Sequence, residues 1–194
     1  MIQDKNFEVF ISKENIAKRV SEISLQISDK FHDTNPVIIS ILNGSFIFTA
    51  DIIRELDIDC EVDFIKISSY EGMNSTGSIK MSKDISADIK NRRVIIVEDI
   101  IDSGLSIKYL YEHIIKYKPK NITIVSLLAK TNNYKLNFNI DIIGFEISSE
   151  FVVGYGLDFN QRFRNLKSIF KLNSPSRWLK EIFMEQNKKP KDNK

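Results

Sequence analysis

Two segments of the chain share one pattern, in which a β-branched run is followed by a turn of small residues and then by a helix. In the first, VIISILN (37–43) precedes Gly44 and SFIFTADIIREL (45–56), whose apolar residues have helical spacing. In the second, VIIVEDIIDSGLSIKYLYEHIIKYK (94–118) has the same order. Uninterrupted β-branched runs are typical of parallel strands that helices cover on both faces. Two such units predict an α/β fold with a mostly parallel central sheet flanked by helices.

The rest of the chain predicts further elements around these units. Apolar residues recur at three- and four-residue spacing from Ile16 to Phe31, which predicts an amphipathic helix over residues 12–31. The polar stretch 71–91 is expected to be a long mobile excursion that has room for a weak hairpin. We also predict strands in 61–70, 121–130, 140–147 and 151–159, and a last amphipathic segment in 177–186.

Composition limits the class of protein, its cellular compartment and its possible partners. With 194 residues, 42% of them hydrophobic, the chain can bury a substantial core without disulfides or structural metal. A single cysteine, Cys60, cannot close an internal disulfide, which favours a reducing compartment. No segment has the character of a signal peptide or a membrane span, and the net charge of +2 gives no sign of nucleic-acid binding. We therefore expect a cytoplasmic protein with neither a membrane nor a nucleic acid as its partner.

The segment VIIVEDIIDSGLS (94–106) carries the densest chemistry. Glu98 and Asp99 end a buried strand, where two adjacent carboxylates suit a ribose diol or a hydrated Mg²⁺. Residues 103–106 then open a helix, whose free N–H groups, hydroxyls and dipole suit a phosphate dianion. Asp102 lies between these two functions. A helix cap and a solvated acidic pair are the plainer interpretation, but three carboxylates in five positions after a buried strand favour a site.

Open α/β sheets bind ligands where the carboxyl ends of their strands meet. The ends of the predicted strands carry several polar or flexible residues at such points. The sequence therefore predicts that Asn43-Gly44, Glu98 to Ser106, Lys130 and Asp158 converge on one crevice.

The segment 94–106 closely resembles the phosphoribosyl-pyrophosphate (PRPP) loop of the type I purine phosphoribosyltransferases, and among them the hypoxanthine-guanine phosphoribosyltransferases. Four further motifs occur in the family's order, so the resemblance runs from about residue 37 to about residue 172. They are LNGS (42–45), similar to the first pyrophosphate loop; Ser69-Tyr70, similar to the dipeptide of the flexible lid; GFEI (144–147) with FVVGY (151–155), similar to the purine-binding strand and loop; and the pair Asp158 and Arg164.

The resemblance implies a role for each matched residue. Asp102 would be the general base that takes the proton from purine N7, while Glu98 and Asp99 would serve the ribose hydroxyls and Mg²⁺. The other positions fall into groups: Ser103, Gly104, Leu105 and Ser106 for the 5′-phosphate; Asn43, Gly44 and Arg164 for pyrophosphate; Lys130, Phe151, Val152 and Asp158 for the purine; Asp158 also for the second Mg²⁺; and Ser69 and Tyr70 for the lid.

Three of the purine-binding positions have a competing interpretation. Lys130 would donate to the purine 6-oxo group, Phe151 would stack on the ring, and Val152 would contact its edge through backbone groups. Viewed alone, they are explained as well or better as an exposed strand-end lysine and two core residues. The functional interpretation depends on their place among the other motifs.

One matched position departs from the family pattern. Much of the family has a Lys or Arg after the leucine of the first pyrophosphate loop, where this chain has Asn43. The substitution removes a cation but leaves the backbone of Gly44 free to approach the leaving group. We expect an altered affinity for PRPP rather than loss of function.

The resemblance also implies the organisation and activity of the whole chain. A single phosphoribosyltransferase domain would span residues 1–172, with a small hood over the purine formed by the N-terminal and late segments, and residues 173–194 would form a helical extension and a frayed basic tail. The implied enzyme transfers 5-phosphoribosyl from PRPP to hypoxanthine or guanine, with two Mg²⁺ ions, as a homodimer or homotetramer. A preference for xanthine, and a nucleotide-sensing regulator with the same fold, stay open as alternatives.

Overall fold

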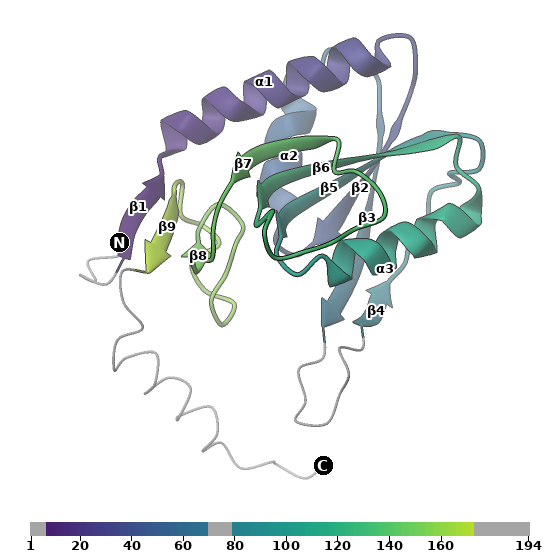
Figure 1. The fold of residues 1–194 in the computed structure, drawn as a ribbon. Coiled ribbons are helices and arrows are strands. Elements are labelled where there is room, and N and C mark those ends of the chain that lie inside the picture. Colours follow the sequence, from purple (N-terminus) through teal and green to yellow (C-terminus); the bar gives the residue numbers. More distant parts are fainter. Residues whose placement is uncertain (1–6, 70–78, 173–194) are drawn as a thin grey trace, which may run out of the picture.

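The computed structural model describes residues 7–69 and 79–172, which fold into an α/β structure (Figure 1). Its elements are β1 (Phe7–Ile11), α1 (Lys13–Phe31), β2 (Val37–Leu42), α2 (Phe46–Glu55), β3 (Glu61–Ser69), β4 (Ile79–Lys83), β5 (Arg93–Ile101), α3 (Leu105–Ile114), a short 3₁₀ helix (Ile115–Tyr117), β6 (Asn121–Ala129), β7 (Ile142–Glu146), β8 (Val152–Val153) and β9 (Ile169–Leu172).

The described strands form two sheets. The larger has the order β4-β3-β2-β5-β6-β7 and is parallel except for β4, which pairs antiparallel with β3. The smaller has the order β1-β9-β8 and is antiparallel. The mostly parallel central sheet confirms the fold class predicted from the two strand-turn-helix units.

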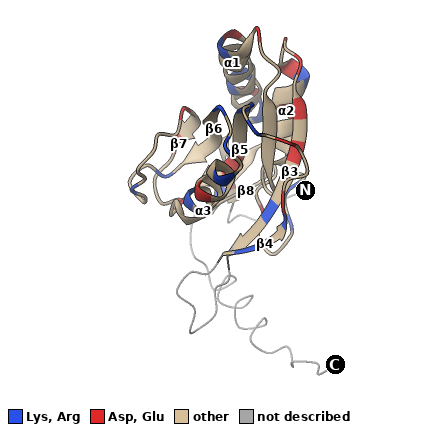
Figure 2. Cartoon of the chain, turned by 90° about the vertical axis from the view of Figure 1, so that its right-hand side faces the viewer, with Lys and Arg blue, Asp and Glu red and all other residues tan. Residues whose placement is uncertain are grey.

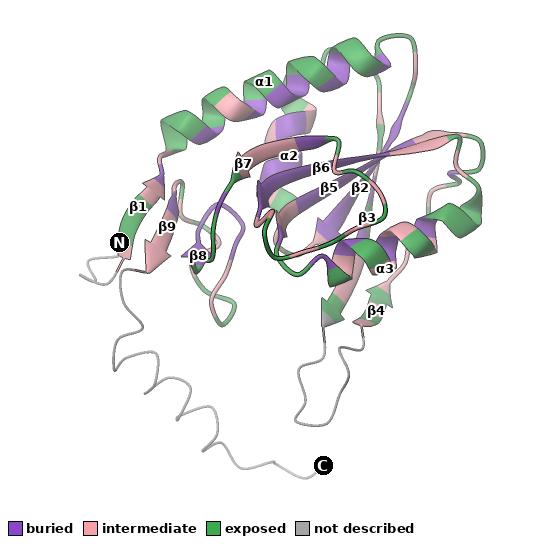
Figure 3. Cartoon of the chain, viewed as in Figure 1, coloured by how far each residue is buried: buried purple, intermediate pink, exposed green. Residues whose placement is uncertain are grey.

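Helices cover both faces of the large sheet, as the β-branched runs require. In β2, Ile38 packs in the cluster that contains the apolar residues of α1 and α2, whereas Val37 and Ile39 pack in the cluster that contains those of α3. Figure 2 shows α3 on one side of the sheet and α1 and α2 on the other. The central strands are accordingly the most buried part of the fold (Figure 3). Burial on both faces explains why these strands lack an alternating pattern.

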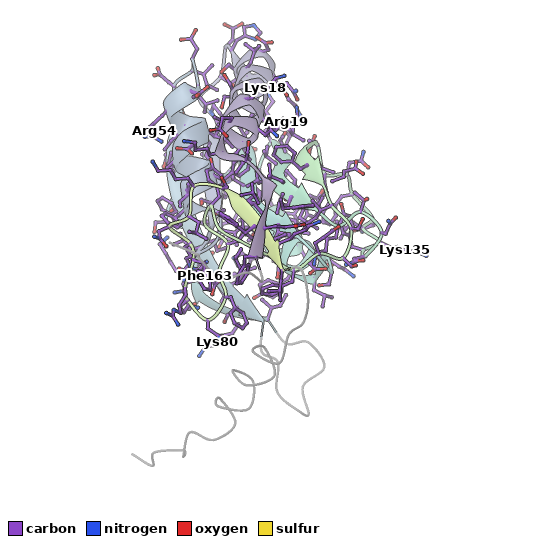
Figure 4. All side chains as sticks on the ribbon, turned by 90° about the vertical axis from the view of Figure 1, so that its left-hand side faces the viewer. Lys18, Arg19, Arg54, Lys80, Lys135 and Phe163 are labelled. Atoms are coloured by element: carbon purple, nitrogen blue, oxygen red, sulfur yellow. The ribbon has the colours of Figure 1, made fainter. Side chains whose placement is uncertain are left out.

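The helix α1 confirms the first amphipathic prediction. Ser12 caps it by accepting a hydrogen bond from the backbone N–H of Asn15. Arg19, labelled in Figure 4, donates from Nε and Nη2 to the carbonyl oxygens of Gly144 and Ile143, at 2.9 and 2.7 Å. Because both carbonyls belong to β7, these bonds fasten α1 to the edge of the large sheet.

The second half of the polar stretch 71–91 contains the hairpin for which our prediction left room, and the segment after it is more ordered than a mobile excursion. Strand β4 pairs with β3, and the segment after it is anchored by Asp63, which accepts hydrogen bonds from Ala87 N at 2.9 Å and Lys83 Nζ at 3.1 Å. Ile89, later in that segment, is fully buried. Long-range pairing and one buried carboxylate therefore order a sequence whose composition is typical of a loop. The first half of the stretch lies outside the described residues.

The small sheet joins the two ends of the described chain, because β1 pairs with β9 and β9 with β8. Neither β1 nor β9 was predicted from the sequence. The strand predicted in 151–159 is also too long, since only Val152 and Val153 are β-strand, and Gly154 and Gly156 adopt φ values of 101° and 99° that turn the chain. The amphipathic segment 177–186 lies outside the described residues, and the division at residue 172 stays a prediction.

None of the helices among the described residues is both long enough and apolar enough to cross a membrane.

Candidate active site

The predicted crevice has a hollow at the carboxyl end of β5. A pocket of about 410 Å³ opens there, beside the start of α3. Parallel pairing brings the ends of β2 and β6 to the same edge of the sheet. The pocket is lined by Glu98, Ile100, Ile101, Asp102, Ser103, Gly104, Ser106 and Ile107.

Glu98 and Asp99 lie near the end of β5. Glu98 is 6% exposed. Burial raises the pKa of Glu98 well above its ordinary value, and the neighbouring charge of Asp99 raises it further. Burial also raises the pKa of Asp99, although the positive charge of Arg164 acts in the opposite direction. Two adjacent carboxylates whose ionisation is suppressed form a site where a cation would be strongly stabilised.

The N-terminus of α3 is open toward the pocket. Its first residue is Leu105, and Gly104 precedes it with φ of 75° and no side-chain cap. Ser103 Oγ lies 3.4 Å from the N–H of Leu105, at the long limit for a hydrogen bond. A Cβ atom at Gly104 would lie 2.9 Å from the Cβ of Tyr134, so a larger residue would crowd the turn. This helix start therefore differs from the plain Asp or Ser cap, and it suits an anion.

Asp102 is held at both carboxylate oxygens. Lys130 Nζ lies 2.6 Å from Oδ2, and Asn133 Nδ2 donates to Oδ1 at 2.9 Å. Burial opposes ionisation of Asp102, but the hydrogen bonds from Lys130 and Asn133 outweigh it and lower the pKa. The Asp102 side chain is 53% exposed and so stays accessible from the pocket. The structure thus brings together the residues predicted to act on purine N7 and on the 6-oxo group.

Gly44 forms a second wall, which packs against Asp99 near the end of β5. The Leu42-Asn43 peptide bond is cis, and a Cβ atom at Gly44 would overlap the carboxylate of Asp99. A Cβ atom at Gly156 would in turn overlap the carbonyl oxygen of Gly44. Glycine is therefore required at both positions, because the loop after β2 is packed between the end of β5 and the turn after β8.

A cluster of buried hydroxyls joins the two elements that flank this loop, β2 and α2. Ser40 Oγ lies 2.8 Å from both Ser45 Oγ and Thr49 Oγ1, and Ser45 Oγ donates to the carbonyl of Ile41. All three hydroxyl side chains are almost completely buried. Their mutual hydrogen bonds join the end of β2 to the first turn of α2.

Arg164 and Asp158 extend the Gly44 wall. Arg164 Nη1 donates to the carbonyl of Gly156 at 2.8 Å, and Arg164 Nη2 lies 2.7 Å from Asp158 Oδ1. Asp158 Oδ2 also accepts a hydrogen bond from the N–H of Gln161. These bonds fix a guanidinium and a carboxylate close to Asp99, so the predicted pyrophosphate residues meet at one wall.

The remaining predicted residues lie in other elements. Phe151 is 44% exposed and its ring meets that of Phe159 edge to face, with 5.6 Å between centroids. Val152 is buried in β8. Ser69 is the last residue of β3 and pairs with Ile79 of β4, whereas Tyr70 lies outside the described residues.

Sequence reasoning missed two residues of the site. Asn133 follows a predicted strand end by only a few positions, and a single Asn in a polar turn gave no signal that it reaches Asp102. Gly156 lies one residue beyond the purine-loop match at 151–155 and was given no role, although two glycines two positions apart predict a tight turn. Its contact with Gly44 joins residues that lie far apart in the sequence, which no local pattern reveals.

The fold and the crevice define a phosphoribosyltransferase domain. The family model for the phosphoribosyl transferase domain matches residues 11–160, which include the crevice walls at Gly44, Asp99, Asp102 and Lys130.

Comparison with known proteins identifies the family within this class of phosphoribosyltransferases. The chain is 42% identical over 163 residues to the hypoxanthine-guanine phosphoribosyltransferase of Bacillus subtilis, covering 84% of this chain and 91% of that protein. A crystal structure of a hypoxanthine-guanine phosphoribosyltransferase from Bacillus anthracis is 41% identical, with a TM-score of 0.80, covering 85% of this chain and 98% of that one. The Trypanosoma cruzi hypoxanthine phosphoribosyltransferase in complex with the product IMP is 33% identical, with a TM-score of 0.81, covering 90% and 98%. The chain therefore belongs to the hypoxanthine-guanine phosphoribosyltransferase family, whose members are glycosyltransferase enzymes.

Proposed function

We propose that this chain transfers the 5-phosphoribosyl group from PRPP to hypoxanthine or guanine, forming IMP or GMP and releasing pyrophosphate. N9 of the purine bonds to C1′ of the ribose as the bond from C1′ to pyrophosphate breaks. The proton on purine N7 passes to Asp102. The observation that carries the proposal is the pairing of Asp102 with Lys130 in a pocket that opens beside the N-terminus of α3.

The two ends of the pocket suit the two ends of the sugar phosphate. The N-terminus of α3, with Ser103, Gly104, Leu105 and Ser106, would hold the 5′-phosphate by backbone N–H groups and hydroxyls. Asn43, Gly44 and Arg164 would hold pyrophosphate, toward which the guanidinium supplies a positive charge. The C1′ atom would then lie between these anchors, close to Asp102.

The purine would lie between the large sheet and the small one. Lys130 would donate to the 6-oxo group, Phe151 would stack on the ring and Val152 would contact its edge through the backbone. The 44% exposed ring of Phe151 leaves apolar surface that a purine could cover. Ser69 and Tyr70 would belong to a lid that excludes water from the reacting C1′.

Magnesium fits the acidic residues of the site. Within the described residues no cluster of three or more His, Cys, Asp or Glu side chains is placed to hold a metal alone. Magnesium is often held by one or two carboxylates together with substrate phosphates, and the adjacent Glu98 and Asp99 both have a raised pKa that a cation would lower. We infer that Glu98 and Asp99 hold one ion with the ribose diol and that Asp158 holds a second beside pyrophosphate. When bound, these ions would neutralise charge that develops on the leaving group.

We also propose that the chain forms a homo-oligomer and that it works in the cytoplasm. Phe46 in the first βα unit and Phe64 in the following strand β3 are 44% and 37% exposed, and such apolar surface suits contact between subunits of a homodimer or homotetramer. The lone Cys60 agrees with a reducing cytoplasm. Light scattering coupled to size-exclusion chromatography would measure the oligomer, and a monomer at micromolar concentration would contradict this assignment.

A spectrophotometric assay of the purified chain with PRPP and Mg²⁺ tests the reaction. Hypoxanthine, guanine, xanthine, adenine and uracil are supplied separately, with and without a chelator. We expect turnover of hypoxanthine and guanine that chelation abolishes. A dominant rate with xanthine would correct the substrate, and binding of PRPP or nucleotides without turnover of any base would favour the regulator of the same fold. A regulator that binds RNA needs a basic face, but α1 and α3 carry interspersed charges in Figure 2.

A further inference from the structure

The carboxylate of Asp102 is shared by two donors of different kinds. The ammonium of Lys130 lies 2.6 Å from Oδ2, and the neutral amide of Asn133 donates to Oδ1 at 2.9 Å. The Lys130 side chain is 11% exposed, so its charge is largely withdrawn from water and directed at Asp102. An ion pair of this kind stabilises the carboxylate anion and makes it a weaker base.

This pairing conflicts with catalysis unless one donor leaves. The proposed function requires Lys130 to donate to the purine 6-oxo group and Asp102 to accept the N7 proton. While Lys130 stays on Oδ2, it neutralises the base and occupies one of its two oxygens. Transfer of Lys130 to the 6-oxo oxygen resolves the conflict, because it strengthens the base when the purine arrives.

After that transfer Asp102 keeps one of its two observed donors, Asn133. We propose that Asn133 is a positioning residue, which holds Asp102 in its reactive orientation while Lys130 binds the purine. This inference rests on the proposed phosphoribosyl transfer. A neutral amide suits the task, since it orients a carboxylate and lowers its basicity less than a cation at the same distance would.

The backbone supports this role. The N–H of Asn133 donates to the carbonyl of Lys130 at 2.8 Å, which closes a tight turn directly after β6. The N–H of Lys130 donates to the carbonyl of Ile101 at 2.9 Å, which joins the same turn to the end of β5 next to Asp102. The next residue, Tyr134, packs against Gly104 at the start of α3. Asn133 is thus placed relative to Asp102 by main-chain bonds that do not need the Lys130 ammonium.

Three substitutions test the proposal by steady-state kinetics over a range of pH. Asn133→Asp preserves the size and the turn preference of the side chain but replaces a donor by a negative charge. Asn133→Ala removes the side chain. Asn132→Ala is the matched control, because the neighbouring Asn132 is also exposed and lies in the same turn. Thermal unfolding of each variant shows whether the turn has been damaged.

We expect kcat to fall about tenfold in Asn133→Ala, the size of one hydrogen bond to a charged group, with little change in the KM for PRPP. In Asn133→Asp the fall should be larger. Loss of the donor raises the pKa of Asp102, so the acid-side decline of kcat should move to higher pH in both variants, and further in Asn133→Asp. Asn132→Ala should behave like the unaltered chain.

The possible failures can be told apart. Turnover in the unaltered chain together with an unchanged kcat and pH profile in Asn133→Asp would overturn the positioning role alone. A residue that only shapes the turn would tolerate Asp, so loss in Asn133→Ala but not in Asn133→Asp would overturn that role as well. Absence of turnover in the unaltered chain would overturn the proposed function and, with it, this inference.

Discussion

The two walls of the crevice are built by different means. The glycine wall, made of Gly44, Gly156 and Arg164, is held by backbone atoms in contact and by a guanidinium bonded to a main-chain carbonyl. The base wall, made of Asp102, Lys130 and Asn133, is held by side-chain hydrogen bonds at the surface. The contact between Gly156 and the Gly44 carbonyl cannot change without moving the chain, whereas the base wall can exchange partners by rotating side chains.

This difference matches the chemistry assigned to each wall. A leaving pyrophosphate gains charge as the bond to C1′ breaks, and donors that are already in place stabilise it without reorganisation. A general base must instead change its protonation state, so its partners must change with it. The site thus combines a rigid side and an adjustable one. Three substitutions test this difference, and a fourth lies outside both walls.

The largest effect is expected at the base wall. Asp102→Asn preserves the shape of the side chain but removes the proton acceptor. We expect kcat to fall by roughly a hundredfold or more, the usual scale for a positioned base, while the Kd for PRPP stays unchanged. Steady-state kinetics and calorimetric PRPP titration would measure the two quantities. Near-normal turnover would remove Asp102 from this role and with it the distinction between the walls.

The next effect is expected at the glycine wall. In Gly44→Ala the new methyl group would overlap the Asp99 carboxylate, which has to shift. Displacement of about 1 Å at a reacting centre costs on the order of a hundredfold, so kcat/KM for PRPP should fall between about tenfold and a hundredfold. Kinetics at saturating hypoxanthine provide the measurement. If the variant matched the unaltered chain, the glycine wall would be more adjustable than its contacts indicate.

A smaller and more selective effect is expected at Lys130. Lys130→Ala removes the donor to the 6-oxo group, so the KM for hypoxanthine should rise by about tenfold. The KM for PRPP should stay nearly constant, because Lys130 lies on the base wall and not on the pyrophosphate side. Separate titrations of the two substrates provide the test, and unchanged purine kinetics would count against the assignment.

The smallest effect on the chemistry is expected from Asp63, which lies outside both walls. Burial opposes its ionisation, but hydrogen bonds from the N–H groups of Ala87, Ser86 and Phe64 and from Lys83 lower its pKa to about 2. Because the folded-state pKa lies below the ordinary 3.8, the stabilisation is present above about pH 4 and is lost as the pH falls toward 2. It amounts to about 2 kcal/mol.

Asp63→Asn should therefore lower the free energy of unfolding by about 2 kcal/mol near neutral pH. The difference from the unaltered chain should shrink as the pH falls from about 4 toward 2. Urea denaturation at several pH values would measure it. A difference that stayed constant over this range would show that the hydrogen bonds of Asp63 do not depend on its charge.

The site was predictable where function requires several residues close together in the sequence. The acidic pair, Asp102 and the start of α3 lie within nine consecutive positions, so a local pattern contains the strand end, the base and the phosphate-binding turn. Asn133 and the contact between Gly44 and Gly156 were not predictable, since each depends on segments that meet only after folding. The strands β1 and β9 were missed for the same reason, because Phe7 and Leu172 pair across almost the whole described chain.

The sequence by itself determined the fold class, the order of its strand-turn-helix units and the residue types at the crevice, because burial on two faces and helix periodicity leave local patterns. Only the tertiary structure decided which of those residues touch. It placed Lys130 and Asn133 on opposite oxygens of Asp102, and it ordered the polar segment after β4 around Asp63. Hydrogen bonds and close backbone contacts depend on distances between segments, and those distances are set by the packing of the whole sheet and its helices.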